Sequence, residues 1–225
     1  MAEVFPSSPT PSAILFDLEN VSRSGGISTN GQEQIVQSGV SRWTATVAGL
    51  FIRRNDQILA WRALAARMRG RSGTILVPVF DGKRANWPRD QYGRQLKPNF
   101  TRYRALDGTQ YESPELPQAS RIIASFSASA AHRATTVQIS MSQGTPPQVG
   151  QYFSPSPGRL HIITEAIGGT AYRIEPPLRA PVTAGQAVNF ERPTCEMRLK
   201  EDAGASLPLS LMQFSNLSLD FVEAF

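Results

Sequence analysis

Alternating apolar and polar side chains predict a chain built mainly of β-strands. Residues 14–19 alternate in this way near the N-terminus, as a strand with one buried face does. The β-branched and nearly uncharged stretch 42–52 predicts a strand that is covered on both faces. Residues 22–31, rich in Ser, Gly and Asn, predict the long tip of a hairpin between these stretches, with a weaker strand at 34–36.

One segment repeats its apolar residues with the period of an α-helix. We expect this helix at about 56–69, with one face packed on a sheet. Asn55 fits the N-cap position, and Gly70 fits the position just after the helix end. The apolar residues recur three or four positions apart: Ile58, Trp61, Leu64, Ala65 and Met68.

The second half of the chain predicts short strands separated by turns of Gly and Pro, of which the chain has 17 each. Residues 121–142 alternate as a half-exposed antiparallel hairpin does. Before them, residues 74–80 predict a buried strand in which Pro78 indicates a sheet edge or a bulge. Strands spaced by about ten residues are typical of a β-sandwich or a small barrel. Further strands are predicted at 148–153, 159–163, 171–174, 195–199 and 217–221.

Two segments lack such a pattern. The first ten residues are rich in Pro and Ser and predict a flexible or extended arm without a targeting signal. Residues 81–118 predict a long functional loop, an insertion or an interface arm. The longest uncharged stretch, 43–52, is well short of the roughly 20 residues that span a bilayer, so we expect no membrane insertion.

The net charge of +5 is concentrated in one segment. Between Arg53 and Arg104, 13 Lys and Arg residues stand against 3 Asp and Glu residues, whereas both flanking parts are slightly acidic. Arginines beside aromatic rings suit a protein–protein interface, single-strand nucleic-acid binding, or a solvated loop without a special partner. We favour the first interpretation. The candidate subunit-interface residues are Arg84, Arg89, Arg94, Arg102, Arg104, Trp87, Tyr92 and Tyr103.

No catalytic motif is present, and we expect no enzymatic activity, no cofactor and no metal site. The single cysteine, Cys195, alternates with apolar neighbours and predicts a buried thiol. His132 falls in a predicted turn, and His161 points to the strand face opposite its apolar neighbours. Asp17 and Glu19 share a strand face and could in principle form an acid pair, but a solvated face fits them better.

A set of short phrases follows one order from Arg42 to the end of the chain. The phrases are Arg42-Trp43, Trp61-Arg62-Ala63, Arg69-Gly70, 74–79, 154–163, 176–181, 188–193, Arg198-Leu199 and 221–225. This ordered set resembles the distal tail proteins of long-tailed bacteriophages, which are minor tail proteins of the tail tip. The resemblance runs from about Arg42 to the C-terminus and does not cover the N-terminal arm or residues 81–118.

The resemblance implies a virion structural protein of the tail tip, made in the host cytoplasm. It implies a homo-hexameric ring that connects the tail tube protein to the tail hub or baseplate protein. The implied fold is mainly β. Residues 1–80 and 189–225 would form a tail-tube-like β-sandwich or barrel domain with a flanking α-helix, and residues 81–188 an inserted OB-like β-barrel with the long loop 81–118.

In such a ring, inward-facing strands of neighbouring subunits would surround a lumen that DNA crosses without specific binding. We expect the lumen-facing positions to avoid the basic cluster, because arginines there would retain DNA through counterion release. Two alternatives stay open. One is a single-strand nucleic-acid-binding OB-type module that uses the same arginines and aromatic rings, and the other is a carbohydrate- or receptor-binding module.

Overall fold

The computed structural model divides the chain into two compact units. Unit 1 comprises Met1–Phe80, Pro157–Leu160 and Pro193–Phe225, and unit 2 comprises Asp81–Ser156 and His161–Arg192. The family resemblance implies domain boundaries at 80/81 and at about 188/189. In the structure the chain leaves unit 1 after Phe80, returns to it briefly at Pro157–Leu160 and returns for good at Pro193. Both units consist mainly of strands, which confirms the mainly β fold class. The structure describes residues 2–6, 11–79, 86–89, 91–93, 103–104, 110–111, 122–205 and 215–224.

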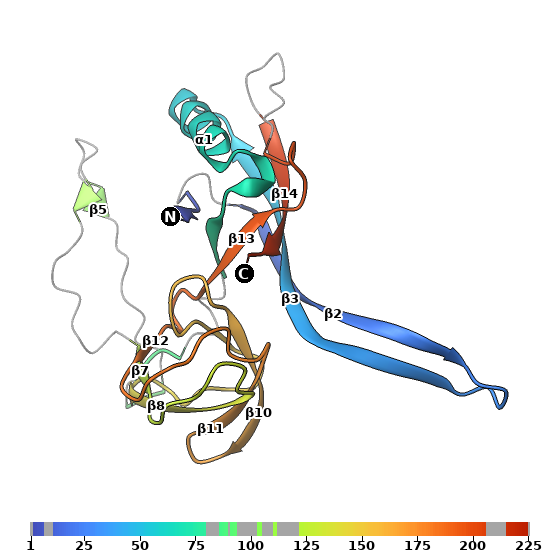
Figure 1. Cartoon of the computed structure of the whole chain (residues 1–225). Coiled ribbons are helices and arrows are strands. Elements are labelled where there is room, and N and C mark those ends of the chain that lie inside the picture. Colours follow the sequence, from blue (N-terminus) through green and yellow to red (C-terminus); the bar gives the residue numbers. More distant parts are fainter. Residues whose placement is uncertain are drawn as a thin grey trace. The chain divides into compact units, whose positions relative to one another are not determined.

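Unit 1 is built on one six-stranded sheet (Figure 1). Its strands stand in the order β1-β4-β13-β14-β3-β2, and all pairs are antiparallel except the parallel pair of β1 and β4. The bounds are β1 Glu3–Val4, β2 Ala13–Ile27, β3 Glu33–Ile52, β4 Ile75–Pro78, β13 Thr194–Leu199 and β14 Ser215–Glu223. Alternate residues of the central strands β3, β13 and β14 are buried, as the sequence pattern predicts.

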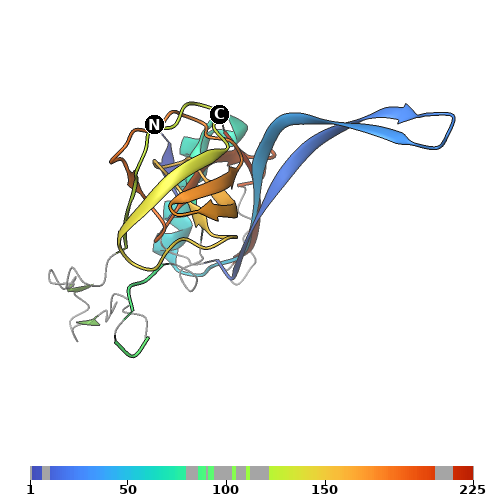
Figure 2. The ribbon, with the colours of Figure 1, turned by 90° about the horizontal axis from the view of Figure 1, so that it is seen from below.

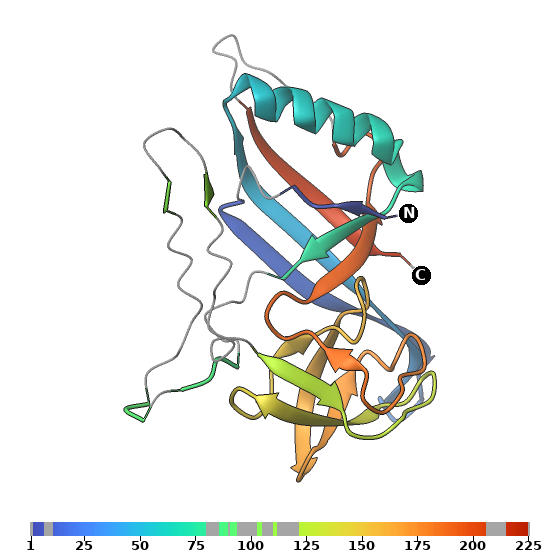
Figure 3. The same ribbon diagram turned by 90° about the vertical axis from the view of Figure 1, so that its left-hand side faces the viewer.

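Helix α1, Asn55–Met68, packs its apolar side on one face of this sheet (Figure 3). Its buried residues are Ile58, Trp61, Leu64 and Met68, so the predicted helical period is confirmed. The helix begins one residue earlier than expected: the N-cap is Arg54, and Gln57 Oε1 accepts its backbone N–H at 3.2 Å. At the other end Arg69 takes the left-handed conformation, and Gly70 opens the short 3-10 helix η1, Gly70–Ser72.

The predicted hairpin is confirmed, but its predicted long tip is wrong. Strand β2 continues to Ile27 and β3 begins at Glu33, so the turn occupies only residues 28–32. The two strands pair from Ala13↔Ala48 to Ile27↔Glu33, with register shifts between Asn20 and Ser22 and between Ser24 and Ile27. Ser, Gly and Asn have low β propensity, but antiparallel backbone pairing over a long register overrides that local preference here.

Two further expectations for unit 1 concern the N-terminal arm and Pro78. Of the predicted flexible or extended arm, Glu3 and Val4 are extended and form β1, and Phe5 is only 2% exposed, whereas residues 7–10 lie outside the described residues. The expected edge position of Pro78 needs correction. Strand β4 does not lie at an edge, since it pairs with β1 on one side and β13 on the other. Pro78 is tolerated because it ends the strand opposite Thr194, beyond the two residues that pair with β1.

Unit 2 is a six-stranded sheet that almost closes into a barrel. Its order is β12-β7-β8-β11-β10-β9, and the paired backbone bonds between Ser154 and Asn189, at 3.0 and 2.9 Å, join the two ends. The predicted OB-like barrel would have five strands, whereas this sheet has six. The bounds are β7 Ile123–Phe126, β8 Thr136–Gln143, β9 Tyr152–Phe153, β10 His161–Gly168, β11 Ala171–Glu175 and β12 Ala187–Val188, and a separate pair consists of β5 Tyr103–Arg104 and β6 Gln110–Tyr111.

The core of unit 2 explains one correction. Strands β7 and β8 form the predicted hairpin, with Ala124, Phe126 and Ile139 buried. His161, however, is fully buried rather than on an outer face. Its Nδ1 lies 2.8 Å from the carbonyl oxygen of Pro176, and its ring stacks at a tilt on Phe153. A hydrogen bond of this kind lets an imidazole occupy a core position, which the period of the strand does not reveal.

Candidate functional site

The β2–β3 hairpin continues beyond the sheet of unit 1 as a two-stranded ribbon (Figures 1 and 2). Strand β14 pairs with β3 only from Ile52 back to Thr44, and closer to the turn β3 pairs with β2 alone. We call residues 20–27 and 33–41 the hairpin ribbon. Strand β2 is also the edge of its sheet, and within the described part of the chain no strand pairs with its outer side. Its backbone is therefore open to pairing with another strand.

The hairpin ribbon carries exposed apolar side chains and little charge. Ile27, Ile35 and Val36 are 75%, 64% and 57% exposed. Arg23 and Glu33 are its charged residues, and it contains no Lys or Pro, two residue types that keep edge strands from pairing. Because an isolated two-stranded ribbon is at best marginally stable in water, these features favour a partner along the ribbon.

Trp43 lies where the hairpin ribbon leaves the sheet, a place that we call the root of the ribbon, and it makes several contacts there. The backbone N–H of Trp43 donates to Glu223 Oε2 at 2.9 Å, and its indole N–H donates to the Leu160 carbonyl at 2.8 Å. Phe16 packs edge-on against the indole ring, with a centroid distance of 6.4 Å. These buried contacts fix the direction in which β3 leaves the sheet.

An ion pair between β2 and β3 lies beside this root. Arg42 Nε donates to Glu19 Oε2 at 2.7 Å, and both side chains are nearly half exposed. This hydrogen bond, together with the positive charge of Arg42, lowers the pKa of Glu19 below its ordinary value of 4.5. A carboxyl group held in its ionised form is a poor general acid, which argues against an acid pair with Asp17.

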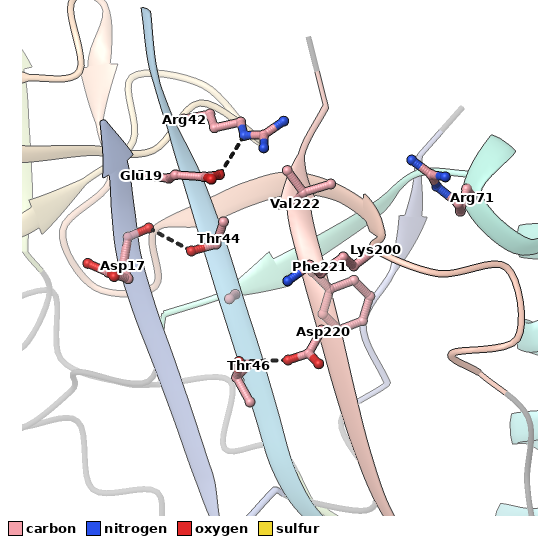
Figure 4. Close-up of a pocket in the computed structure, with 11 residues that line it drawn as sticks. Asp17, Glu19, Arg42, Thr44, Thr46, Arg71, Lys200, Asp220, Phe221 and Val222 are labelled. Carbon is pink, nitrogen blue, oxygen red and sulfur yellow. Dashed lines mark hydrogen bonds and ion pairs between the residues drawn. The ribbon is translucent and has the colours of Figure 1, made fainter. Parts of the chain in front are cut away.

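The same face of the sheet forms an open pocket of about 580 Å³ (Figure 4). Thr46 Oγ1 donates to Asp220 at 2.7 Å, and Thr44 Oγ1 donates to the Asp17 carbonyl at 3.3 Å. The charged residues that line the pocket are three acidic ones, Asp17, Glu19 and Asp220, and three basic ones, Arg42, Arg71 and Lys200. The pocket is thus polar, with acidic and basic side chains in equal number.

The candidate interface residues from the sequence are only partly described. Trp87 needs correction, because it is only 5% exposed and does not offer its ring to a partner. Tyr92 is 76% exposed, and Arg89 Nη1 donates to the Gly93 carbonyl at 2.8 Å. Tyr103 and Arg104 form β5, with only their backbone described. Arg84, Arg94 and Arg102 lie outside the described residues.

Glu223 is a buried residue beside the candidate site that the sequence analysis missed. It is 3% exposed at the end of β14. A signal was present, since a carboxylate in the apolar phrase 221–225 occupies a position that alternation assigns to the core. The buried carboxylate implied a specific backbone donor, but not which one.

No metal or membrane feature emerges from the described residues. Among them, no three His, Cys, Asp or Glu side chains gather as metal ligands would. Cys195 is buried, as predicted. The helices α1 and η1 are both too short or too polar to cross a bilayer, and they are the helices in the described ranges. No protein-family model matches this chain, and a search of curated proteins found no match.

Proposed function

We propose that this chain is a structural subunit of a bacteriophage tail tip and acts by self-assembly rather than catalysis. Six copies form a ring that connects the tail tube protein to the tail hub or baseplate protein. The family resemblance of the ordered phrases motivates this role. In this proposal the protein belongs to the virion tail tip and does not insert into a membrane.

The single observation that supports assembly best is the open edge of β2 together with the hairpin ribbon. Strand β2 runs from Ala13 to Ile27 as the last strand of its sheet, and the ribbon exposes Ile27, Ile35 and Val36. A long and weakly charged edge is a template for strand addition. Contact between this edge and a different edge of the next copy is heterologous, and heterologous contacts generate rings when the rotation closes.

The exposed face of the sheet is compatible with a lumen that DNA crosses. That face presents three acidic side chains, Asp17, Glu19 and Asp220, against three basic ones, Arg42, Arg71 and Lys200. Glu19 and Arg42 form an ion pair. A face whose acidic and basic charges balance attracts phosphates less than a basic face, which would hold DNA through counterion release. We therefore assign this face to the lumen side of the proposed ring.

The alternatives have less support. A single-strand nucleic-acid binder stacks bases on exposed aromatic rings, and Trp87, one of the rings in the basic segment, is buried. Because its ring is buried, Trp87 also does not offer a surface on which a sugar could stack in a carbohydrate- or receptor-binding module. Tyr92 is the exposed ring of the described part of that segment.

Negative-stain microscopy of the purified chain, combined with oligonucleotide binding, tests the proposal. We expect closed six-fold rings and no binding of single-stranded oligonucleotides between 50 and 200 mM salt. Affinity that falls by orders of magnitude over this salt range, without rings, would instead support the nucleic-acid alternative.

A further inference from the structure

The N-terminal strand is a small, separable part of the sheet. Strand β1 consists of Glu3 and Val4, and the Glu3 and Phe5 backbone N–H groups donate to the carbonyls of Thr74 and Leu76 at 2.8 and 3.2 Å. Phe5 is the buried anchor, and the Glu3 carboxylate accepts from Arg67 Nε at 2.9 Å. One aromatic anchor plus main-chain hydrogen bonds is how an extended peptide adds to a sheet edge.

The position of β1 in the sheet does not follow from its position in the chain. It precedes β2 in sequence, but in the order β1-β4-β13-β14-β3-β2 the two strands lie at opposite edges. The stretch from Phe5 to Ser12 therefore connects one edge of the sheet to the other, and its residues 7–10 lie outside the described part of the chain.

In a head-to-tail ring, β4 of a neighbouring copy can lie closer to the start of β2 than β4 of the same chain does. Suppose that the β2 edge of one copy meets the opposite edge of the next copy, where β1 covers β4. The segment that precedes β2 then starts beside the neighbour's β4. A connection from Phe5 to Ser12 reaches about 24 Å when extended. That is several times the spacing of about 4.8 Å between strands, so it is long enough to cross the seam between two copies.

We propose that in the assembled ring the N-terminal strand of each copy docks on β4 of the neighbouring copy. The inference rests on the proposed ring and names the segment that links its subunits. The exchanged strand uses the same Phe5 site, the same Thr74 and Leu76 acceptors and the same Arg67 as the strand does within one chain. Exchange of an identical element needs no new contact chemistry, and it ties each subunit to the next.

The register of β1 on β4 provides the test. Val4 and Leu76 are Cα partners on adjacent strands, a separation that suits a disulfide. The variants V4C and L76C, each carrying one new cysteine, are co-expressed so that rings contain both, and are oxidised mildly. Cys195 is buried, so the wild-type chain and each single variant alone are matched controls.

Exchange predicts a disulfide-linked dimer from the co-expressed pair and none from the controls. In the double variant V4C/L76C it predicts a reducible ladder that extends to six chains. If rings form but the double variant links only within single chains and the pair gives no dimer, the exchange is overturned while the ring stands. If no rings form, both proposals fail.

A second pair guards against a folding defect in the first. Replacing Glu3 and Arg67, which are joined by the 2.9 Å ion pair on the surface, gives E3C and R67C. A short bismaleimide applied to co-expressed E3C and R67C should again produce dimers between chains. Absence of dimers in rings made with both pairs contradicts the exchange.

Discussion

The side-chain carboxylate of Glu223 accepts the backbone N–H of Trp43 at 2.9 Å, where β14 ends and β3 continues into the hairpin ribbon. The carboxylate thus accepts a backbone N–H of β3, as a backbone carbonyl of a paired strand would. E223A removes the acceptor of a buried N–H, and we expect it to lower the free energy of unfolding by about 1–3 kcal/mol. Urea unfolding followed by tryptophan fluorescence measures this loss.

The matched control for this contact is E223Q. Its amide oxygen can still accept the Trp43 N–H, so the loss should stay below about 1 kcal/mol. Equal unfolding midpoints for wild type and E223A would show that the hydrogen bond does not hold the root of the ribbon.

The Glu19–Arg42 ion pair predicts a dependence on pH. Because the hydrogen bond from Arg42 lowers the pKa of Glu19 below 4.5 in the folded chain, its contribution to stability is present above pH 4.5. It is lost as the pH falls below 4.5 and through the folded-state pKa. In R42Q the Glu19 carboxyl should titrate closer to 4.5, as NMR of the side-chain carboxyl carbon would show. A Glu19 titration that is identical in R42Q and wild type would refute the assigned cause.

Gly49 predicts a steric effect at the bulge between β3 and β14. Its φ is +69°, and a Cβ added there would overlap the Ser12 hydroxyl group. Gly31, in the turn of the hairpin, has a φ of +80° but open space around it. We expect G31A to cost about 1–2 kcal/mol from the left-handed backbone alone, and G49A about 1–3 kcal/mol more from overpacking. Thermal unfolding compares the two, and equal losses would rule out the clash.

The hairpin ribbon predicts a separation between assembly and stability. Ile27 and Ile35 are highly exposed, so the double variant I27K/I35K should change the free energy of unfolding of the single chain by no more than about 0.5 kcal/mol. In a ring whose neighbours cover the ribbon, the same change buries unpaired charge. We expect assembly to weaken by at least about tenfold.

Sedimentation over a concentration series measures that weakening. I167K is the matched control, because Ile167 in β10 of unit 2 is 50% exposed and lies outside the ribbon. Unchanged assembly of I27K/I35K, or equal weakening by I167K, would contradict a specific role of the ribbon.

The sequence predicted the elements whose side chains carry a clear period. The helix, the central strand of the first half and the hairpin of unit 2 follow directly from the spacing of residues such as Trp61, Val47 and Phe126. The barrel of unit 2 also follows from the regular spacing of short strands. These elements bury one face against a core, and burial is what the period records.

The ribbon and the site residues could not be predicted in the same way. Residues 22–27 pair through their backbone in a strand with both faces exposed, so their side chains carry no period. Phe5 and Glu223 are fixed by contacts with residues far away in sequence, Leu76 and Trp43. Trp87 was predicted to be exposed because it lies among arginines in the sequence, but its ring is buried.

Native mass spectrometry of the purified chain tests the central claim of self-assembly most directly. We expect a discrete complex of six copies of the 24.6 kDa chain, which I27K/I35K shifts to single chains and I167K leaves intact. A spectrum that contains only single chains, at concentrations up to the solubility limit, would contradict it.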